Sequence, residues 1–169
     1  MSKIGLFYAS STGNTESVAK TIKEKITQVD VDFHDVSSCS KDAMIEYDFI
    51  IMGISTWGDG DLQDDWEDYF SNVSKIDFST KTVALFGLGD QEEYPDTYLD
   101  AMGTLYTELM NNSATVVGSW PTDGYEHDES TAIIDGEFVG LALDEDNQDD
   151  LTDTRIDSWI EQISPYFIK

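Results

Sequence analysis

Near its start the sequence reads Ile4-Gly5-Leu6-Phe7-Tyr8-Ala9-Ser10-Ser11-Thr12-Gly13-Asn14-Thr15. The apolar run over residues 4–9 predicts a buried strand, and apolar residues recur after it at helical spacing, at Val18, Ala19, Ile22 and Ile26. A loop rich in hydroxyl groups therefore joins a strand to a helix. Such a loop directs free backbone N–H groups and the positive end of a helix dipole at one point, where a phosphate can be held without a cation. The alternative is an ordinary helix cap, for which one or two of these hydroxyls would suffice.

The rest of the chain alternates apolar runs with helical stripes. Strands are predicted at residues 31–34, 49–54, 83–88, 116–117 and 140–143. Helical stripes are predicted over residues 62–70, 98–109 and 156–163, with Pro165 at the end of the last one. This βαβ order calls for a parallel sheet with helices on both faces. The polar, turn-rich segment 119–139 predicts a loop of about twenty residues that splits the fifth strand, and loops of that length are usually functional or disordered.

Length and charge restrict the class of protein further. A chain of 169 residues predicts one domain spanning residues 1–169. A net charge of −26 excludes nucleic acid and anionic membrane surfaces as partners, since both require clustered lysine and arginine. The single cysteine, Cys39, provides neither a disulfide framework nor a cysteine-based metal site. No apolar run has the length needed for a signal segment or a membrane span, so we expect a cytoplasmic protein.

Two further loops follow strands at the edge of the sheet where ligands bind in open α/β folds. One covers residues 55–61 and the other covers residues 89–94. Each carries a large aromatic residue, Trp57 in the first and Tyr94 in the second. Either residue alone would be read as a packing residue. Two aromatics in facing loops beside a phosphate loop instead predict a sandwich around a flat heterocycle.

These features together resemble the flavodoxins, specifically the long-chain type. The resemblance rests on the hydroxyl loop, on Thr56-Trp57, on Gly89-Asp90-Gln91 with Tyr94, on the long insertion, and on the segment 140–147. It covers nearly the whole chain. It implies a doubly wound α/β fold with a five-stranded parallel sheet in the order 2-1-3-4-5, non-covalently bound FMN, and one-electron transfer.

The resemblance also assigns roles to residues. It implies that residues 10–15 hold the FMN phosphate, that Trp57 and Tyr94 stack on the two faces of the flavin, and that Thr56 and Asp146 lie near the ribityl chain. Backbone groups near Gly58, Asp59 and Asp90 would meet the polar edge of the ring. The full set of implied cofactor-binding residues is Ser10, Ser11, Thr12, Gly13, Asn14, Thr15, Ser55, Thr56, Trp57, Gly58, Asp59, Gly60, Leu88, Gly89, Asp90, Tyr94 and Asp146.

The charge distribution supports an electron carrier without a substrate-transforming site. No lysine or arginine lies between Lys41 and Lys75 or between Lys81 and Arg155, and carboxylates cluster after both ring loops. Extra negative charge on the ring would therefore be disfavoured, which predicts a low potential. The ring loops hold no histidine, cysteine or lysine to act on a substrate. We expect redox-protein partners with basic docking surfaces, such as a ferredoxin-NADP reductase, and a monomer.

Other readings explain fewer of the residues. A P-loop hydrolase needs a lysine that the hydroxyl loop lacks, and a receiver domain needs an aspartate at the end of the third strand, where Gly53-Ile54-Ser55 stands. A calcium loop at residues 144–155 lacks the glycine and glutamate that such loops require, and we expect no metal site. The remaining alternative is an FMN-dependent NAD(P)H reductase, which needs space for nicotinamide over the ring.

Overall fold

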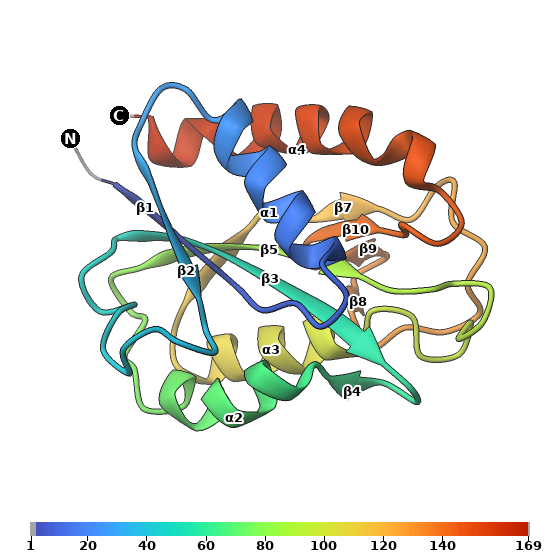
Figure 1. Cartoon of the computed structure of the whole chain (residues 1–169), viewed down its shortest axis with the longest axis horizontal. Helices are drawn as coiled ribbons and strands as arrows, with labels where there is room; N and C mark the ends of the chain where they lie inside the picture. Colours follow the sequence, from blue (N-terminus) through green and yellow to red (C-terminus); the bar gives the residue numbers. More distant parts are fainter. Residues whose placement is uncertain (1–2, 169) are drawn as a thin grey trace.

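A parallel β-sheet forms the centre of the molecule in the computed structural model, which describes residues 3–168 (Figure 1). Its strands are β1 (Ile4–Tyr8), β2 (Val31–Asp35), β3 (Phe49–Trp57), β5 (Thr82–Leu88), β6 (Thr115–Val117) and β10 (Leu141–Leu143). They lie in the order β2-β1-β3-β5, and both β6 and β10 pair in parallel with β5. The last two are the halves of the fifth strand. The predicted order 2-1-3-4-5 is therefore confirmed, as is the split of the fifth strand.

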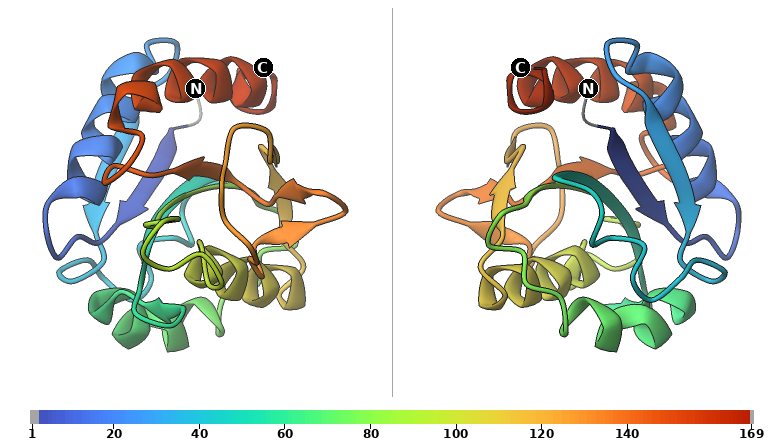
Figure 2. Two further views of the ribbon diagram at one scale, coloured as in Figure 1. Left: turned by 90° about the vertical axis from the view of Figure 1, so that its right-hand side faces the viewer. Right: turned by 90° about the vertical axis from the view of Figure 1, so that its left-hand side faces the viewer.

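Two pairs of helices cover the two faces of this sheet (Figures 1 and 2). Helices α1 (Asn14–Lys25) and α4 (Thr152–Phe167) pack on one face, and α2 (Asp64–Val73) and α3 (Asp100–Asn111) on the other. A single 3₁₀ turn, η1 (Asp149–Leu151), leads into α4. Continuous apolar strands buried between two helical layers are what a doubly wound sheet requires.

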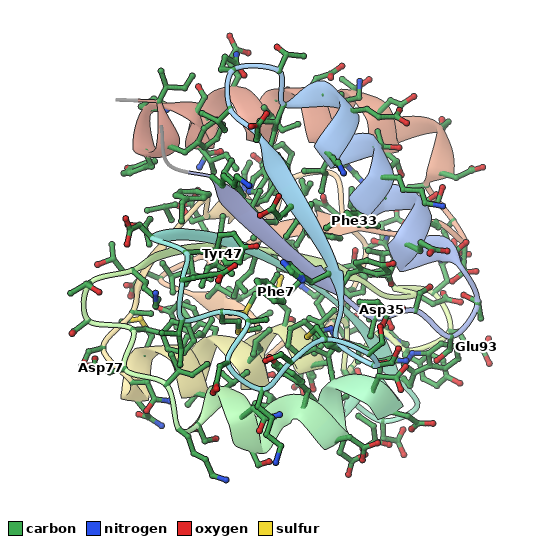
Figure 3. The ribbon with its side chains drawn as sticks, turned by 60° about the vertical axis from the view of Figure 1, so that its left-hand side comes forward. Phe7, Phe33, Asp35, Tyr47, Asp77 and Glu93 are labelled. Atoms are coloured by element: carbon green, nitrogen blue, oxygen red, sulfur yellow. The ribbon has the colours of Figure 1, made fainter. Side chains whose placement is uncertain are left out.

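Alternate side chains of each strand belong to opposite layers of the core. On β1, Phe7 packs in the layer of α2 and α3, while its neighbour Tyr8 packs in the layer of α1 and α4. Figure 3 shows the same division, with Phe33 on the α1 side and Phe7 and Tyr47 on the other. The period-2 alternation of β-strands gives each layer its own set of residues.

Several boundaries differ from the sequence prediction. Leu62, predicted to be helical, lies in β4 (Asp61–Leu62), which forms an antiparallel hairpin with the end of β3. Tyr98 precedes α3, and α4 continues past Pro165 to Phe167. These differences arise because tertiary contacts fix the element ends: the Tyr98 side chain, for example, donates a hydrogen bond to the Leu143 carbonyl.

The predicted loop at residues 119–139 is wrong in one respect, because it contains a small sheet. Strands β7 (Trp120–Pro121), β9 (Glu137–Phe138) and β8 (Ile133–Ile134) pair antiparallel in that order. The Phe138 side chain is fully buried at the middle of this sheet, against the rings of Tyr98 and Tyr125. Packing of Phe138, together with hydrogen bonds such as that from the Thr131 N–H to Asp100, holds the insertion in place.

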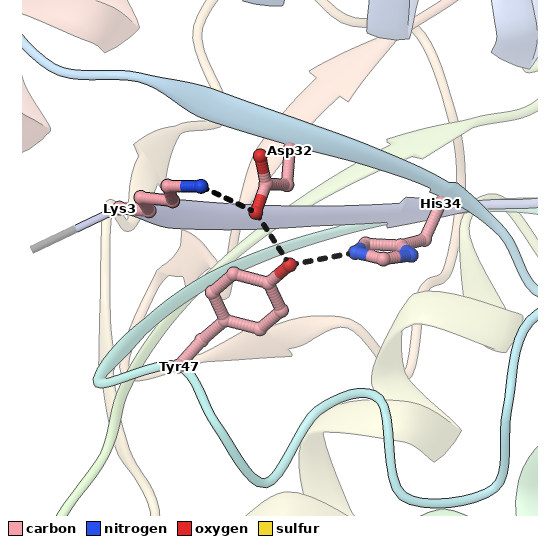
Figure 4. A network of polar contacts seen from close by, with 4 residues as sticks. All are labelled: Lys3, Asp32, His34 and Tyr47. Carbon is pink, nitrogen blue, oxygen red and sulfur yellow. Dashed lines mark hydrogen bonds and ion pairs between the residues drawn. The ribbon is translucent and has the colours of Figure 1, made fainter.

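A polar network runs along the β2 edge of the sheet, from Lys3 before β1 to His34 in β2 (Figure 4). The Tyr47 hydroxyl donates to Asp32 Oδ2 at 2.8 Å and lies 2.8 Å from His34 Nε2, and Lys3 pairs with Asp32 at 3.8 Å. Burial, followed by the hydrogen bond to Asp32, raises the pKa of Tyr47 well above its ordinary value. The network satisfies polar groups that the edge strand would otherwise leave against the core.

Candidate functional site

A cavity of about 380 Å³ lies at the carboxyl ends of β1, β3, β5 and β10. Loops that follow four strands meet there, as expected for an open parallel sheet. Its lining consists of Ser11, Thr12, Asn14, Thr15, Ser55, Thr56, Trp57, Gly58, Leu88, Gly89, Asp90, Tyr94, Glu145 and Asp146. No lysine, arginine or histidine is among these lining residues, so an anion in the cavity would be held by neutral donors.

The hydroxyl loop forms one end of the cavity. Helix α1 begins at Asn14, and its N-cap is Gly13, which has a left-handed φ of 94° that glycine adopts at little cost. No side chain among the described residues caps this helix. The reading of the hydroxyls as ordinary helix caps is therefore wrong. The first N–H groups of α1 remain available to a ligand, together with the hydroxyls of Ser11 and Thr12 in the lining.

The loop after β3 forms a second part of the cavity wall. The β3–β4 hairpin pairs Trp57 with Asp61, and Gly58 takes a φ of 50° at the turn between them. The Trp57 indole N–H donates to Ser55 Oγ at 2.8 Å, which orients the ring. The Trp57 side chain is 41% exposed although it lines the cavity. A large aromatic surface left this open at a cavity is suited to stacking on a planar ligand.

The loop after β5 forms another wall of the cavity. Asp90 Oδ1 accepts hydrogen bonds from the backbone N–H groups of Glu92 and Glu93, and the Tyr94 N–H donates to the Asp90 carbonyl. This tight turn places Tyr94 in the lining, where its side chain is 41% exposed, as that of Trp57 is. The two aromatics therefore belong to one cavity, which is what the sandwich prediction needs.

A buried carboxylate anchors this second loop. Asp144 follows β10 and is fully buried, and its oxygens accept hydrogen bonds from the Gln91 side chain at 2.8 Å and the Asn147 side chain at 2.9 Å. Asn147 also donates to Asp90 Oδ1 at 2.8 Å. Gln91 in turn accepts from the Glu126 N–H of the insertion. Sequence reasoning assigned no such role to Asp144, Gln91 or Asn147, because only the fold brings these segments together.

Carboxylates dominate the electrostatics of the cavity rim. Burial raises the pKa of Glu145 above its ordinary value, and nearby carboxylates add to the effect. The pKa of Asp146 is raised first by burial and then by the charges of Asp90 and Asp144. Because the surroundings of Glu145 and Asp146 disfavour their charged forms, they also disfavour further negative charge inside the cavity.

Most of the predicted cofactor residues line this cavity, and four do not. Ser10, Gly13, Asp59 and Gly60 lie in its loops but outside the lining. Ser10 Oγ accepts a hydrogen bond from the Gly13 N–H at 2.9 Å, so both residues shape the hydroxyl loop from within. The hydroxyl of Thr56 accepts from the Ala101 N–H at the start of α3. Glu145 lines the cavity but was not predicted, since its position next to Asp146 carried no separate signal.

The hydroxyl end and the aromatic end fit a phosphorylated flavin. Uncapped N–H groups and hydroxyls suit a phosphate, and two half-exposed aromatics in facing loops suit a planar ring system. Gly58, which takes a left-handed φ at the turn after Trp57, also lines the cavity.

A family model described as flavodoxin matches residues 6–159. The chain is 47% identical over 165 residues to a flavodoxin of Nostoc sp., which covers 98% of this chain and 97% of that protein. It is 45% identical over 164 residues to a flavodoxin of Haemophilus influenzae, with 96% and 94% covered. The fold resembles the crystal structure of Fusobacterium nucleatum flavodoxin bound to flavin mononucleotide, with a TM-score of 0.93 and 32% identity over 98% of this chain and 99% of that one. The cavity, the fold and these matches agree: the chain belongs to the flavodoxin family.

Proposed function

We propose that this chain is a low-potential one-electron carrier that shuttles electrons between redox proteins through a non-covalently bound FMN. The observation that carries the proposal is the composition of the cavity. It has a cation-free set of N–H and hydroxyl donors at one end and two half-exposed aromatic side chains in facing loops at the other. FMN combines a phosphate with a planar ring, and when bound it supplies reversible one-electron chemistry.

Each part of the cavity has a task toward this cofactor. The α1 N-terminus, Ser11 and Thr12 would hold the phosphate, and Trp57 and Tyr94 would cover the two ring faces and exclude water. Thr56 and Asp146 would lie near the ribityl chain. Backbone groups near Gly58, Asp59 and Asp90 would meet the polar edge of the ring, and Ser10, Gly13 and Gly60 would support their loops from behind the lining.

The charge pattern supports a low potential. A carboxylate roughly 10 Å from the ring disfavours an added electron by on the order of 0.4 to 0.8 kcal/mol, at an effective dielectric of about 40 to 80. Several carboxylates act together, and about 1.4 kcal/mol corresponds to roughly 59 mV for one electron. The second reduction should therefore be displaced downward by roughly 50 to 150 mV relative to a neutral site. No cation in the lining offsets this effect.

The same carboxylates support transient docking of partners with basic surfaces. The first turn of α2, which follows the Trp57 loop, carries Asp64, Asp65 and Glu67. Among the described residues, the ion pairs are Lys3–Asp32 and Lys25–Asp157, so the α2 acids face no intramolecular cation. Complementary charge steers a basic partner, such as a ferredoxin-NADP reductase, to the face that holds the ring. None of the described helices is long and apolar enough to cross a membrane.

An FMN-dependent NAD(P)H reductase is not favoured. Such an enzyme needs one ring face open to nicotinamide, whereas aromatic side chains line both walls of this cavity. The lining also contains no histidine, cysteine or lysine to assist chemistry on a substrate. The site therefore supports transfer of electrons to protein partners instead.

Reconstitution with FMN tests this function. The purified apoprotein should bind FMN with one-to-one stoichiometry in a fluorescence titration, and the complex should show no NADPH oxidation without a partner reductase. Trp57→Ala or Tyr94→Ala should weaken FMN binding by roughly 1 to 3 kcal/mol through lost burial and stacking. An apoprotein that leaves the fluorescence of FMN unchanged in this titration would overturn the proposal, and FMN-dependent NADPH oxidation would favour the reductase.

A further inference from the structure

Gln63 connects the hydroxyl loop to the start of α2 although it does not line the cavity. It lies between β4 and α2, and only 2% of its surface is exposed. Its Nε2 donates to Ser11 Oγ of the hydroxyl loop at 3.1 Å and to Asp65 Oδ2 at 2.9 Å. A buried amide thus joins the hydroxyl loop to the helix that follows the Trp57 loop.

Helix α2 fixes the orientation of this amide. Gln63 is the N-cap of α2, and its Oε1 accepts the N–H groups of Asp65 at 2.9 Å and Trp66 at 3.2 Å. A flipped amide would turn its own N–H groups toward these two donors and leave them without an acceptor in a buried place. The Nε2 group therefore faces Ser11 in the only orientation that satisfies the helix.

This contact decides what the Ser11 hydroxyl can offer a ligand. A serine hydroxyl has one proton to donate, and here its oxygen is already engaged as an acceptor. The Ser11 proton is then free to point into the cavity that the residue lines. Ser10 is arranged in the same way within its own loop, since its oxygen accepts the Gly13 N–H. Only the Ser11 contact originates in another element.

We propose that Gln63 is a positioning residue that presents the Ser11 hydroxyl as a donor to the FMN phosphate. The proposal rests on the proposed FMN function. A phosphate site without a cation depends on the direction of each neutral donor, so a second acceptor beside Ser11 would take away one of them. Gln63 directs an N–H group rather than an acceptor at the Ser11 oxygen, so the Ser11 proton has no partner on that side and stays available to the phosphate.

A charge-neutral double substitution isolates this role. Gln63→Glu together with Asp65→Asn keeps the net charge, keeps an oxygen for the two α2 N–H groups, and allows the pair of side chains to remain hydrogen-bonded with the donor reversed. It removes the N–H that points at Ser11 and puts a carboxylate oxygen there, to which the Ser11 proton would turn. We expect the Kd for FMN to rise about 10-fold to 100-fold, the loss of one hydrogen bond to a charged group. Riboflavin, which has no phosphate, should bind unchanged.

A matched control exchanges the amide and the carboxylate of another hydrogen-bonded pair, away from the cavity. Asn112 Nδ2 lies 3.3 Å from Glu108 Oε1 at the end of α3, outside the cavity lining. Glu108→Gln with Asn112→Asp repeats the same chemical exchange there and should leave the Kd of FMN and riboflavin unchanged. The melting temperature of each apoprotein shows whether the helices remain intact, because a merely structural effect would lower it and weaken both ligands.

A cycle with Ser11→Ala completes the test. Ser11 is exposed, so its removal leaves the core intact, and this variant alone should show the same selective loss of FMN binding. Adding the Gln63→Glu/Asp65→Asn pair to it should then change FMN binding no further. An unchanged FMN Kd in either variant, or an equal loss of riboflavin, would overturn the role of Gln63. Failure of the unmodified apoprotein to bind FMN would overturn the proposed function instead.

Discussion

At the scale of single residues, Thr12 is the cleanest probe of the phosphate end. Its side chain is exposed and lines the cavity, and its hydroxyl has no hydrogen bond to another described residue. Thr12→Ala should therefore leave the stability of the apoprotein unchanged and weaken FMN binding about tenfold or more through a lost hydrogen bond to a charged group. Paired titrations with FMN and riboflavin measure this. Equal losses for the two ligands would remove Thr12 from the phosphate site.

Substitutions at Gly58 separate the cost of a left-handed backbone conformation from the cost of a steric clash. Its φ is 50°, and a Cβ added there would meet only Asp61 Oδ2, at 3.5 Å. Gly58→Val should destabilise the apoprotein by about 1 to 2 kcal/mol, because a β-branched residue is strained in the left-handed region. Gly58→Asn should cost less, since asparagine tolerates this region. Urea denaturation of both variants gives the comparison, and equal losses would point to a steric cause.

Most residues that line the cavity were predictable from the sequence, and those that hold its loops by hydrogen bonds were not. Trp57, Tyr94 and the hydroxyl loop can be recognised in the sequence because each follows an apolar run. That position places them at the carboxyl ends of the strands, where ligands bind in open α/β sheets. Gln63 and Asp144 give no such signal. Their importance depends on hydrogen bonds to partners 52 residues away for Gln63 and 53 residues away for Asp144, and sequence spacing does not reveal such pairs.

At the scale of elements, the inserted segment contains a fully buried aromatic anchor. Phe138 in β9 is fully buried and packs against Tyr98, Tyr125 and His127. Phe138→Ala should lower the free energy of unfolding by about 3 to 5 kcal/mol, the usual cost of removing a buried aromatic ring. Denaturant unfolding measures it, with Ile134→Ala in the neighbouring β8 as a control, because Ile134 is 46% exposed. Similar losses in both variants would contradict the anchor role.

The acidic surface formed by Asp61 of β4 and by Asp64 and Asp68 of α2 should govern encounter with partners. Replacing Asp61, Asp64 and Asp68 with lysine should slow electron transfer to a basic partner about tenfold or more at low salt and flatten its salt dependence. The control set replaces exposed acids near the opposite end of the sheet, at Glu24, Asp30 and Glu46. Stopped-flow rates over a range of ionic strength provide the measurement. Equal effects from the two sets would show that total charge, rather than the α2 surface, controls docking.

The long regular elements were predicted well, and the short ones were not. Strands such as β3 and β5 are continuous apolar runs that only a buried parallel strand explains. The two-residue strands β4, β7, β8 and β9 have no periodicity to detect. They exist because hairpin geometry and the burial of Phe138 hold them, and both are tertiary effects.

At the scale of the whole molecule, the excess of carboxylates links stability to pH. Burial raises the pKa of Glu145 and Asp146, so the folded state binds more protons than the unfolded state just above their ordinary pKa values. The contribution of these two carboxylates to stability should therefore rise as pH falls toward their raised pKa values, which calorimetry of the apoprotein can follow. Burial lowers the pKa of His127, so the contribution of this residue to stability falls with pH over the same range. Glu145→Gln with Asp146→Asn should reduce the rise. Identical dependence of the melting temperature on pH in the unmodified protein and in this variant would contradict the assignment.

The register of the fifth strand has a consequence for how this chain could be shortened. Val117, the last residue of β6, pairs with Ala84, and Leu141, the first of β10, pairs with Phe86. The insertion thus leaves the sheet and returns to it two positions apart on the same neighbour. A single residue would be enough to connect Val117 directly to Leu141. Residues 118–140 therefore leave the sheet and return to it at almost the same place beside β5. Such a segment could be gained or lost in evolution without a change in the pairing of any other strand. Its loss would remove Phe138 from the ring of Tyr98, so other side chains would have to bury that ring.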